Sequence, residues 1–170
     1  METKRLFPRG TLLPTIVLAV VVLWASGCSA AGGGSRAGSI YSENLGTGTL
    51  YDINTKSQSI LNRYQYRIER IESTTDLLYI ETEWKNRYPL DDEIEQGINA
   101  ALTRIIIRAT PRGRGVGSDN NSIRFEAENK VRYQGGEEWH VVPMSRMLIS
   151  HLKDITEDLV VELRTGFRKF

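Results

Sequence analysis

The sequence predicts an α+β domain in which an antiparallel sheet of four to five strands carries an N-terminal and a C-terminal helix on one face. Three observations lead to this prediction. Segments of alternating apolar and polar residues follow one another, a segment with helical spacing precedes them, and a long amphipathic segment follows them. Consecutive strands joined by short turns pair as antiparallel neighbours, and helices at the ends of such a run cover one face of the sheet. The predicted domain comprises residues 50–170.

Each expected helix has one apolar stripe. In the first helix, of about three turns, Leu50, Ile53, Ile60 and Leu61 form the stripe, and Ser57 falls at the same helical spacing. The C-terminal helix is expected to begin at Pro143, and its stripe consists of Leu148, Leu152, Ile155, Leu159 and Leu163. Residues spaced in this way lie on one side of a helix, so both helices are expected to bury that side against the sheet.

Two alternating segments predict the first hairpin. Residues 64–73 alternate through Tyr64, Tyr66 and Ile68, and a Ser-Thr-Thr-Asp turn follows. In residues 77–85, one face is expected to carry Leu78, Ile80, Thr82 and Trp84, whereas the opposite face carries the carboxylates of Glu81 and Glu83. The polar segment 89–97, which contains a proline and a glycine, predicts a long loop with a helical turn over residues 91–96.

A second hairpin is expected over residues 103–133. Its first strand has Thr103, Ile105, Ile107 and Ala109 on the core face, and its second has Ile123, Phe125, Ala127, Val131 and Tyr133. Arg104 and Arg108 lie on the outer face, which predicts cross-strand ion pairs with Glu81 and Glu83. Residues 137–143 are a candidate fifth strand.

The N-terminus has the layout of a secretory signal. METKRLFPRG is a basic start, and about fifteen apolar residues and a few small residues lead to Cys28, the single cysteine of the chain. The apolar run is shorter than the ~20 residues that a spanning helix needs, and Pro14 interrupts it. We therefore expect residues 1–27 to be a signal peptide.

The residues before Cys28 resemble the lipobox of bacterial lipoproteins, with Ala25 in place of the usual leucine, followed by Ser26 and Gly27. This resemblance implies that the chain is cut before Cys28, which carries a diacylglycerol thioether and anchors the protein to a membrane of the cell envelope. Ser29 at the next position implies export to the outer membrane in a host that has one. A buried cysteine in an uncleaved signal anchor is the alternative.

Residues 28–49 are predicted to be the lipidated cysteine and a flexible tether. Residues 29–49 contain six glycines and few apolar residues, a composition typical of flexible linkers. The tether would let the folded domain stand clear of the bilayer.

The order of elements after this segment, together with the stretch YIETEW, resembles the helix-grip modules of BamC, a lipoprotein of the β-barrel assembly machine. The resemblance covers residues 50–166. It implies a module that binds a partner protein of the envelope. That family carries two such modules, whereas this chain has room for one.

Composition argues against catalysis and nucleic-acid binding. Without the first 27 residues, the 22 basic residues fall to 19 and the 21 acidic residues to 20, so we expect no general attraction to nucleic acid. The chain has two histidines, His140 and His151, and its cysteine is assigned to the anchor. Neither a nucleophile–base pair nor a clustered metal-ligand set is evident, so no enzyme, metal or cofactor is predicted.

The one asymmetric feature is a run of arginines in the second hairpin. Arg112 and Arg114 lie in its glycine-rich turn, and Arg108 precedes them on the strand. Guanidinium groups bind phosphates and carboxylates with two hydrogen bonds. Arg108, Arg112 and Arg114 are therefore candidate contacts for anionic lipid or for an acidic envelope partner. The alternative is a solvated turn whose charge only aids solubility.

Together these patterns predict an envelope lipoprotein that acts as a non-catalytic binding or assembly-accessory module. A module that binds lipid, glycan or peptide is the competing class, and an enzyme is the third. A deep apolar pocket between helix and sheet would favour ligand binding. A flat sheet face with an exposed aromatic patch would favour a protein partner.

Overall fold

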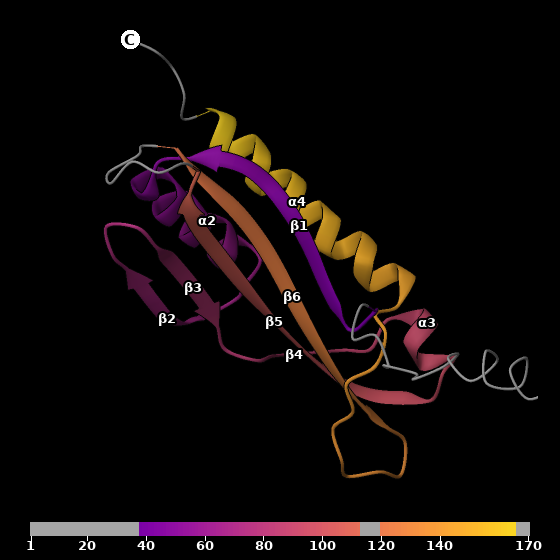
Figure 1. The fold of residues 1–170 in the computed structure, drawn as a ribbon. Helices are drawn as coiled ribbons and strands as arrows, with labels where there is room; N and C mark the ends of the chain where they lie inside the picture. Colours follow the sequence, from indigo (N-terminus) through magenta and orange to yellow (C-terminus); the bar gives the residue numbers. More distant parts are fainter. Residues whose placement is uncertain (1–37, 113–119, 166–170) are drawn as a thin grey trace, which may run out of the picture. The chain divides into compact units, whose positions relative to one another are not determined.

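The computed structural model describes residues 38–112 and 120–165 (Figure 1). Along the chain, its elements are β1 (Ile40–Gly48), α2 (Leu50–Arg63), β2 (Ile68–Ser73), β3 (Leu78–Thr82), β4 (Lys85–Arg87), α3 (Asp91–Ile94), β5 (Ile98–Pro111), β6 (Asn121–Tyr133) and α4 (Arg146–Thr165). The α+β class is confirmed. The sheet has six strands instead of the four to five expected.

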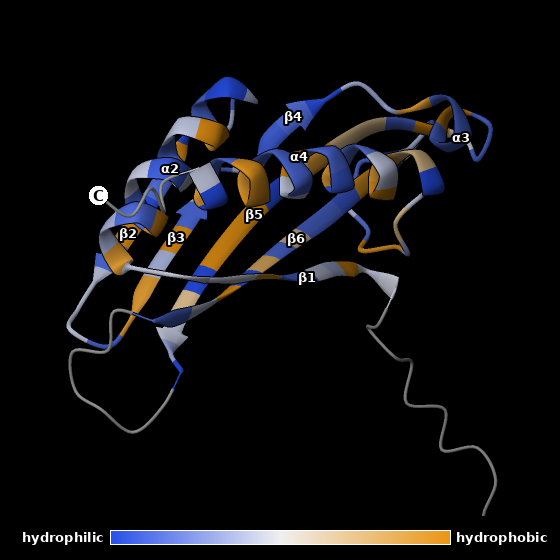
Figure 2. Cartoon of the chain, turned by 90° about the horizontal axis from the view of Figure 1, so that it is seen from above, coloured by the Kyte–Doolittle hydropathy of each residue, from blue (hydrophilic) through white to orange (hydrophobic). Residues whose placement is uncertain are grey.

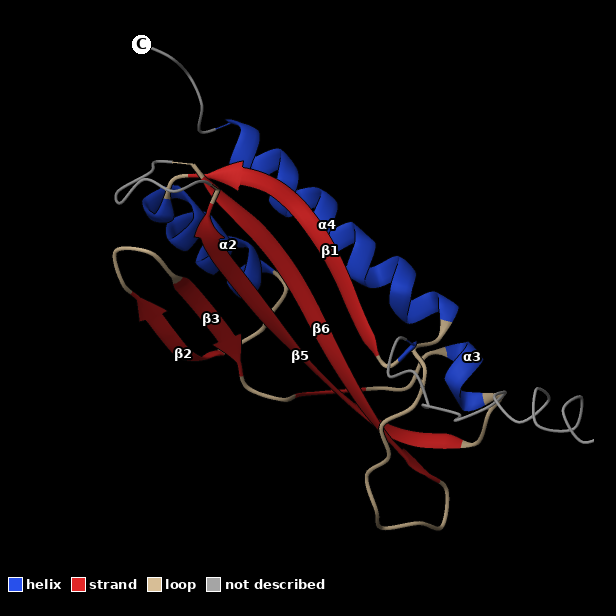
Figure 3. Ribbon diagram, in the orientation of Figure 1, coloured by secondary structure: helices blue, strands red, loops and turns tan. Residues whose placement is uncertain are grey.

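The long hairpin of β5 and β6 is the centre of the sheet (Figure 3). The strand order is β1-β6-β5-β3-β2, with β4 also paired to β5, and every pairing is antiparallel. Residues 137–143, the candidate fifth strand, contribute a single bridge between His140 and Val131. The helical turn expected after residue 90 is α3.

Strand β1 lies where the sequence predicted a flexible tether, so that prediction is wrong for residues 40–48. The strand pairs with β6 along its length, from Ile40 opposite Glu128 to Gly48 opposite Asn121. Its side chains are mostly polar because it is an edge strand, with Leu45 as its one buried large apolar residue. A bulge at Asn44–Gly46, where Gly46 has φ of 101°, interrupts the apolar-polar alternation that would have revealed it. The folded domain therefore begins before Leu50.

Helices α2 and α4 pack on one face of the sheet, as predicted. All five stripe residues expected in α4 are buried, and α2 buries Ile53, Ser57, Ile60 and Leu61. Thr49 caps α2, because its hydroxyl oxygen accepts a hydrogen bond from the Asp52 amide at 3.1 Å. Helix α4 begins at Arg146, three residues after the expected start.

The core fills the space between these helices and the sheet. Its fully buried members include Ile105 and Ile107 of β5, Phe125 of β6, and Leu152 and Leu159 of α4. Figure 2 shows the matching pattern, with β5 strongly hydrophobic and α4 mixed. Tyr133 of β6, expected in the core, is 38% exposed because it lies at the end of the strand, beyond the helices.

A one-residue bulge between β3 and β4 moves Trp84 to the face opposite the one predicted. Glu81 pairs with Ile106 and Lys85 pairs with Thr103. The segment from β3 to β4 therefore contains one residue more than the stretch of β5 that it faces. A one-residue shift reverses the faces of the residues that follow. Strand β2 starts at Ile68, later than the expected residue 64, because α2 continues to Arg63.

Candidate binding surface on the open face of the sheet

One face of the sheet has no helix of residues 38–112 and 120–165 over it, and we call it the open face. Successive side chains of a strand point to opposite faces of the sheet, so the residues of the open face alternate with the core residues along each strand. The open face comprises Tyr79, Glu81, Trp84, Arg104, Ile106, Arg108, Arg124, Glu126, Glu128, Lys130 and Arg132.

The middle of the open face is a row of paired charges. Arg104 donates hydrogen bonds to Glu81 on β3 and, at 2.9 Å, to Glu128 on β6. The predicted ion pair between Glu81 and Arg104 is therefore confirmed. The predicted pairing of Glu83 with these arginines is wrong, because Glu83 pairs with Arg67 at 3.8 Å. Because these guanidinium and carboxylate groups satisfy one another, the middle of the sheet offers little free charge to a ligand.

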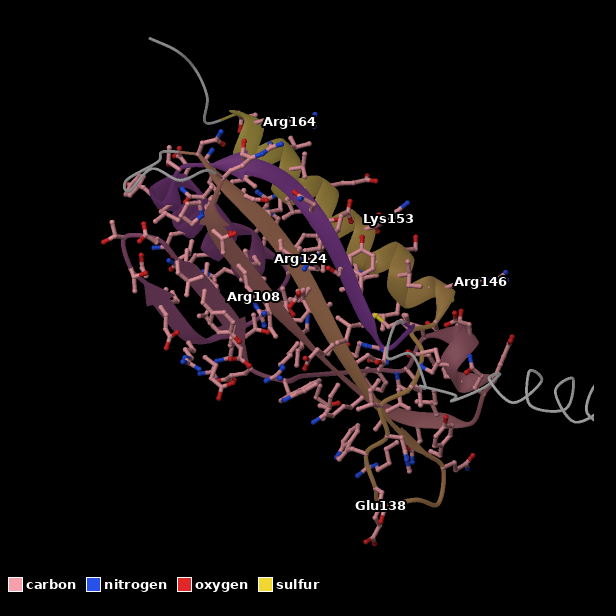
Figure 4. All side chains as sticks on the ribbon, viewed as in Figure 1. Arg108, Arg124, Glu138, Arg146, Lys153 and Arg164 are labelled. Atoms are coloured by element: carbon pink, nitrogen blue, oxygen red, sulfur yellow. The ribbon has the colours of Figure 1, made fainter. Side chains whose placement is uncertain are left out.

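The arginine end of the open face, defined by Arg108, Arg112 and Arg124, is different. Arg108 and Arg124 are directly opposite each other on β5 and β6 (Figure 4). Arg108 lies over the Tyr79 ring, 5.3 Å from its centroid, and pairs with Glu126 at 3.5 Å. Within residues 38–112 and 120–165, Arg124 forms no ion pair. Like charges opposite each other destabilise a strand pair, so this arrangement favours an added anion.

Polar side chains surround the two guanidinium groups. A shallow hollow of about 290 Å³ is lined by Asn44, Arg108, Thr110, Ser122, Arg124 and Glu126. Its hydroxyl, amide and guanidinium groups are hydrogen-bond donors suited to a carboxylate or phosphate. Arg112 is exposed just beyond β5, where its amide donates to the Asn120 carbonyl at 3.0 Å.

The structure places two of the four predicted site residues. Arg108 and Arg112 belong to the arginine end, whereas Cys28 and Arg114 lie outside the described residues. Arg124 was not among the predicted contacts, although it belongs to the same arginine-rich hairpin. Only the register of β5 against β6, which places it opposite Arg108, distinguishes it from the other outward-facing residues of its strand.

Trp84 lies on the open face against Arg104 of β5 and Lys130 of β6. Its ring lies between two cations, with Arg104 4.8 Å and Lys130 4.3 Å from the ring centroid. Cations attract the negative face of an aromatic ring, so the contacts hold Trp84 against the sheet. Beside it lies a second hollow of about 290 Å³ that also includes Ile40 and Val141.

The most buried charges lie on the covered face, where they fasten α3 to the sheet. Arg87 and Glu93 form two parallel hydrogen bonds of 2.6 and 2.7 Å. The guanidinium group also donates to Thr103 at 2.9 Å and Asn129 at 3.0 Å. Because the two charged groups satisfy each other, this cluster is a structural clamp.

His151 lies at an exposed position of α4, close enough to the half-buried Lys85 of β4 for the two groups to interact electrostatically. Lys85 donates to the Tyr64 carbonyl at 2.7 Å, and burial lowers its pKa. Burial first, and then the positive charge of Lys85, lowers the pKa of His151. Among the residues that the structure covers, no group of three or more histidine, cysteine, aspartate or glutamate side chains is placed to hold a metal ion.

Comparison with known proteins finds no relative of the chain. No protein-family model matches the sequence, and no curated protein is similar to it. Of the helices in the described ranges, none is long and apolar enough to cross a membrane.

Proposed function

We propose that this protein is a membrane-anchored envelope lipoprotein that acts as a non-catalytic assembly-accessory module. Its arginine end binds carboxylate groups of an acidic partner protein. The observation that carries the proposal is the pairing of Arg108 directly opposite Arg124, with Arg124 lacking an ion pair in the described part of the chain. The anchor is Cys28, as the small residues before this single cysteine indicate.

A protein partner is favoured over the anchoring bilayer because of where the arginines lie. The described chain enters the domain at Gly38, two residues before β1. Arg112 follows Pro111, whose pairing partner in β6 is Asn121. Asn121 also pairs with Gly48, the last residue of β1, so Arg112 lies at the end of the sheet opposite Gly38. Strand β1 has nine residues, so its two ends are about 27 Å apart. The arginine end thus points away from the point of entry.

The filled space beneath the helices also favours a surface interaction. Ile53, Phe125 and Leu152, which line the interface between helices and sheet, have no exposed surface. A partner would therefore contact the open face, where it can form charge-assisted hydrogen bonds with the arginines.

The anchor is tested with Cys28→Ser in the full-length chain. We expect the lipid mass to be lost and the protein either to remain uncut or to be released from membranes. Cell fractionation and mass spectrometry of the purified protein check this expectation. If both the mature mass and the membrane fraction are unchanged, Cys28 is not the anchor.

The arginine end is tested with Arg112→Glu/Arg124→Glu, compared with Lys153→Glu/Arg164→Glu on α4 as a control of equal charge (Figure 4). Crosslinking in native envelopes should capture an acidic protein with the wild-type chain and the control, but not with the arginine variant. Capture should weaken as salt rises, because exposed charges are screened. Equal capture by all three proteins would contradict the proposal. If no protein is captured but the arginine variant binds phosphatidylglycerol vesicles less than the wild-type chain, the arginines bind lipid instead of a protein.

A further inference from the structure

The exposed apolar side chains are concentrated at one end of the domain. Among the described residues, eleven large apolar residues are exposed, and only Tyr51, Ile71 and Val161 lie elsewhere. The other eight belong to the start of β1, residues 88–94, the end of β6, the segment 134–145 and the start of α4. We call this surface the entry end, because Gly38 lies within it.

Hydrogen bonds show that these segments form one surface. The Met144 amide donates to the Gly38 carbonyl at 2.8 Å, which joins the start of β1 to the approach of α4. The Met147 amide donates to Asp92 at 3.1 Å, which joins α4 to α3. Figure 4 agrees, with Glu138 and Arg146 at the end opposite Arg164.

We infer that the entry end rests on the surface of the lipid bilayer. The inference depends on the anchor at Cys28 proposed above. Nine residues separate Cys28 from Gly38, so the chain between them spans at most about 36 Å. A surface confined so close to a bilayer is at high effective concentration, and weak apolar contacts then suffice to hold it there.

The composition of the entry end suits the boundary between lipid and water. Trp139 is 39% exposed and Val141 is 61% exposed, and Arg132 lies 5.2 Å from the Trp139 ring centroid. Tryptophan and tyrosine favour this boundary because their rings are apolar and carry a polar group. Tyr88 and Tyr133 are exposed in the same region.

The charges of the entry end are mixed, which defines the kind of contact. Lys130, Arg132 and Arg146 are accompanied by acidic residues, among them Glu95 and Glu138. Attraction to anionic lipid would need an excess of positive charge. The contact therefore depends on apolar side chains and is independent of lipid charge.

Fluorescence of Trp139 tests this contact. The full-length chain with Trp24→Phe and Trp84→Phe keeps Trp139 as its sole tryptophan. It is purified from bacterial membranes and reconstituted into phosphatidylcholine vesicles with or without bromine on the acyl chains. Bromine should reduce the emission roughly twofold, because a ring at the interface contacts the upper acyl chains. Adding phosphatidylglycerol should not change this quenching.

Two exposed valines provide the variant and its control. Val141→Asp at the entry end should abolish most of the quenching, whereas Val161→Asp, at a site 59% exposed on the far part of α4, should leave it unchanged. Ile149→Asp serves as a second entry-end variant, and circular dichroism verifies that each variant is folded.

Absence of bromine quenching, or equal quenching in all variants, would overturn the inference. Emission that changes with protein density but not with bromine would overturn it in favour of a second copy covering the surface. Mass spectrometry of the same sample separates this outcome from failure of the anchor. Lipidated Cys28 without quenching refutes only the membrane contact, and quenching without lipid on Cys28 refutes only the anchor.

Discussion

At the scale of single residues, the buried pair of Arg87 and Glu93 is the most consequential polar contact of the described chain. Their side chains are 12% and 2% exposed, and they connect α3 to β4 across the edge of the core. Removing one member of such a pair leaves the other charge buried and unpaired, which is strongly destabilising. The pair therefore determines whether α3 stays on the sheet.

We expect Glu93→Gln to lower the free energy of unfolding by about 3–5 kcal/mol. The control is Asp158→Asn, which removes the 3.5 Å pair with Arg63, where both side chains are about half exposed. That change should cost about 1 kcal/mol or less. Urea denaturation of both variants measures the difference. A similar cost for both would mean that Arg87 and Glu93 are accessible to water.

His151 should make stability depend on pH. Its pKa in the folded protein is lowered from 6.5 by burial and by Lys85 and Arg87, which together outweigh the opposing effect of Asp154. Just below pH 6.5, His151 is therefore protonated more in the unfolded chain than in the folded chain. The associated stability is present above about pH 6.5 and is lost as the pH falls through the lower, folded value.

We expect the melting temperature of the wild-type protein to fall more between pH 7 and pH 5 than that of His151→Gln. Comparing the two proteins isolates His151, because all other titrating groups are shared. Parallel melting curves across this pH interval would show that the imidazole is fully hydrated in the folded state.

At the scale of elements, α4 owes its position to its buried stripe. Leu159 is fully buried, whereas Val161, half a turn further along the same helix, is 59% exposed. Replacing a buried leucine by alanine removes apolar contacts and leaves a cavity. The two positions therefore separate the effect of packing from that of helix propensity.

Leu159→Ala should lower the free energy of unfolding by about 2–5 kcal/mol, whereas Val161→Ala should change it by about half a kcal/mol or less. Thermal and chemical denaturation measure both values. A negligible effect of Leu159→Ala would mean that α4 detaches from the sheet.

Strand β1 is the second element whose contribution can be measured. Its Tyr41 ring contacts the Phe125 ring edge to face at 6.0 Å, and its backbone covers the edge of β6. A chain that begins at Leu50 would lose both contacts and expose the β6 edge to other molecules. We expect this chain to melt at a lower temperature and to aggregate, in contrast to one that begins at Gly38. Equal melting temperatures would make β1 dispensable.

At the scale of the whole molecule, one core connects the two ends of the sheet. It extends without interruption from Leu45 and Ile53 near the arginine end to Met144 and Leu148 near the entry end. A second, smaller cluster consists of Ile98, Ala101 and Val131. A small domain whose main core is continuous usually unfolds in a single transition. The proposed lipid contact and the proposed partner contact would therefore both belong to one cooperative unit.

Two probes should report this single transition. Far-ultraviolet circular dichroism follows the whole fold, and Trp139 fluorescence in the Trp24→Phe/Trp84→Phe chain follows the entry end. We expect their midpoints to coincide and to shift together in Leu159→Ala. Separate midpoints would mean that the entry end unfolds independently.

The sequence by itself determined the elements whose burial follows a local repeat. The stripe of α4 and the alternation through Ile105, Ile107, Ile123 and Phe125 predicted both the elements and their buried sides, because a repeat of 3.6 or 2 residues records which side of an element avoids water. The same alternation placed Glu81 and Arg104 on the outer face of neighbouring strands and so predicted their ion pair.

Only the tertiary structure decided the features that depend on distant partners. Strand β1 is stabilised by β6, about eighty residues later in the chain, and its own polar sequence carries no repeat that would reveal it. The bulge before Trp84 and the pairing of Arg108 with Arg124 depend on register, which neighbouring strands set together. A local pattern shows how one element meets its surroundings, whereas contacts between elements far apart in the chain form only when the whole sheet is assembled.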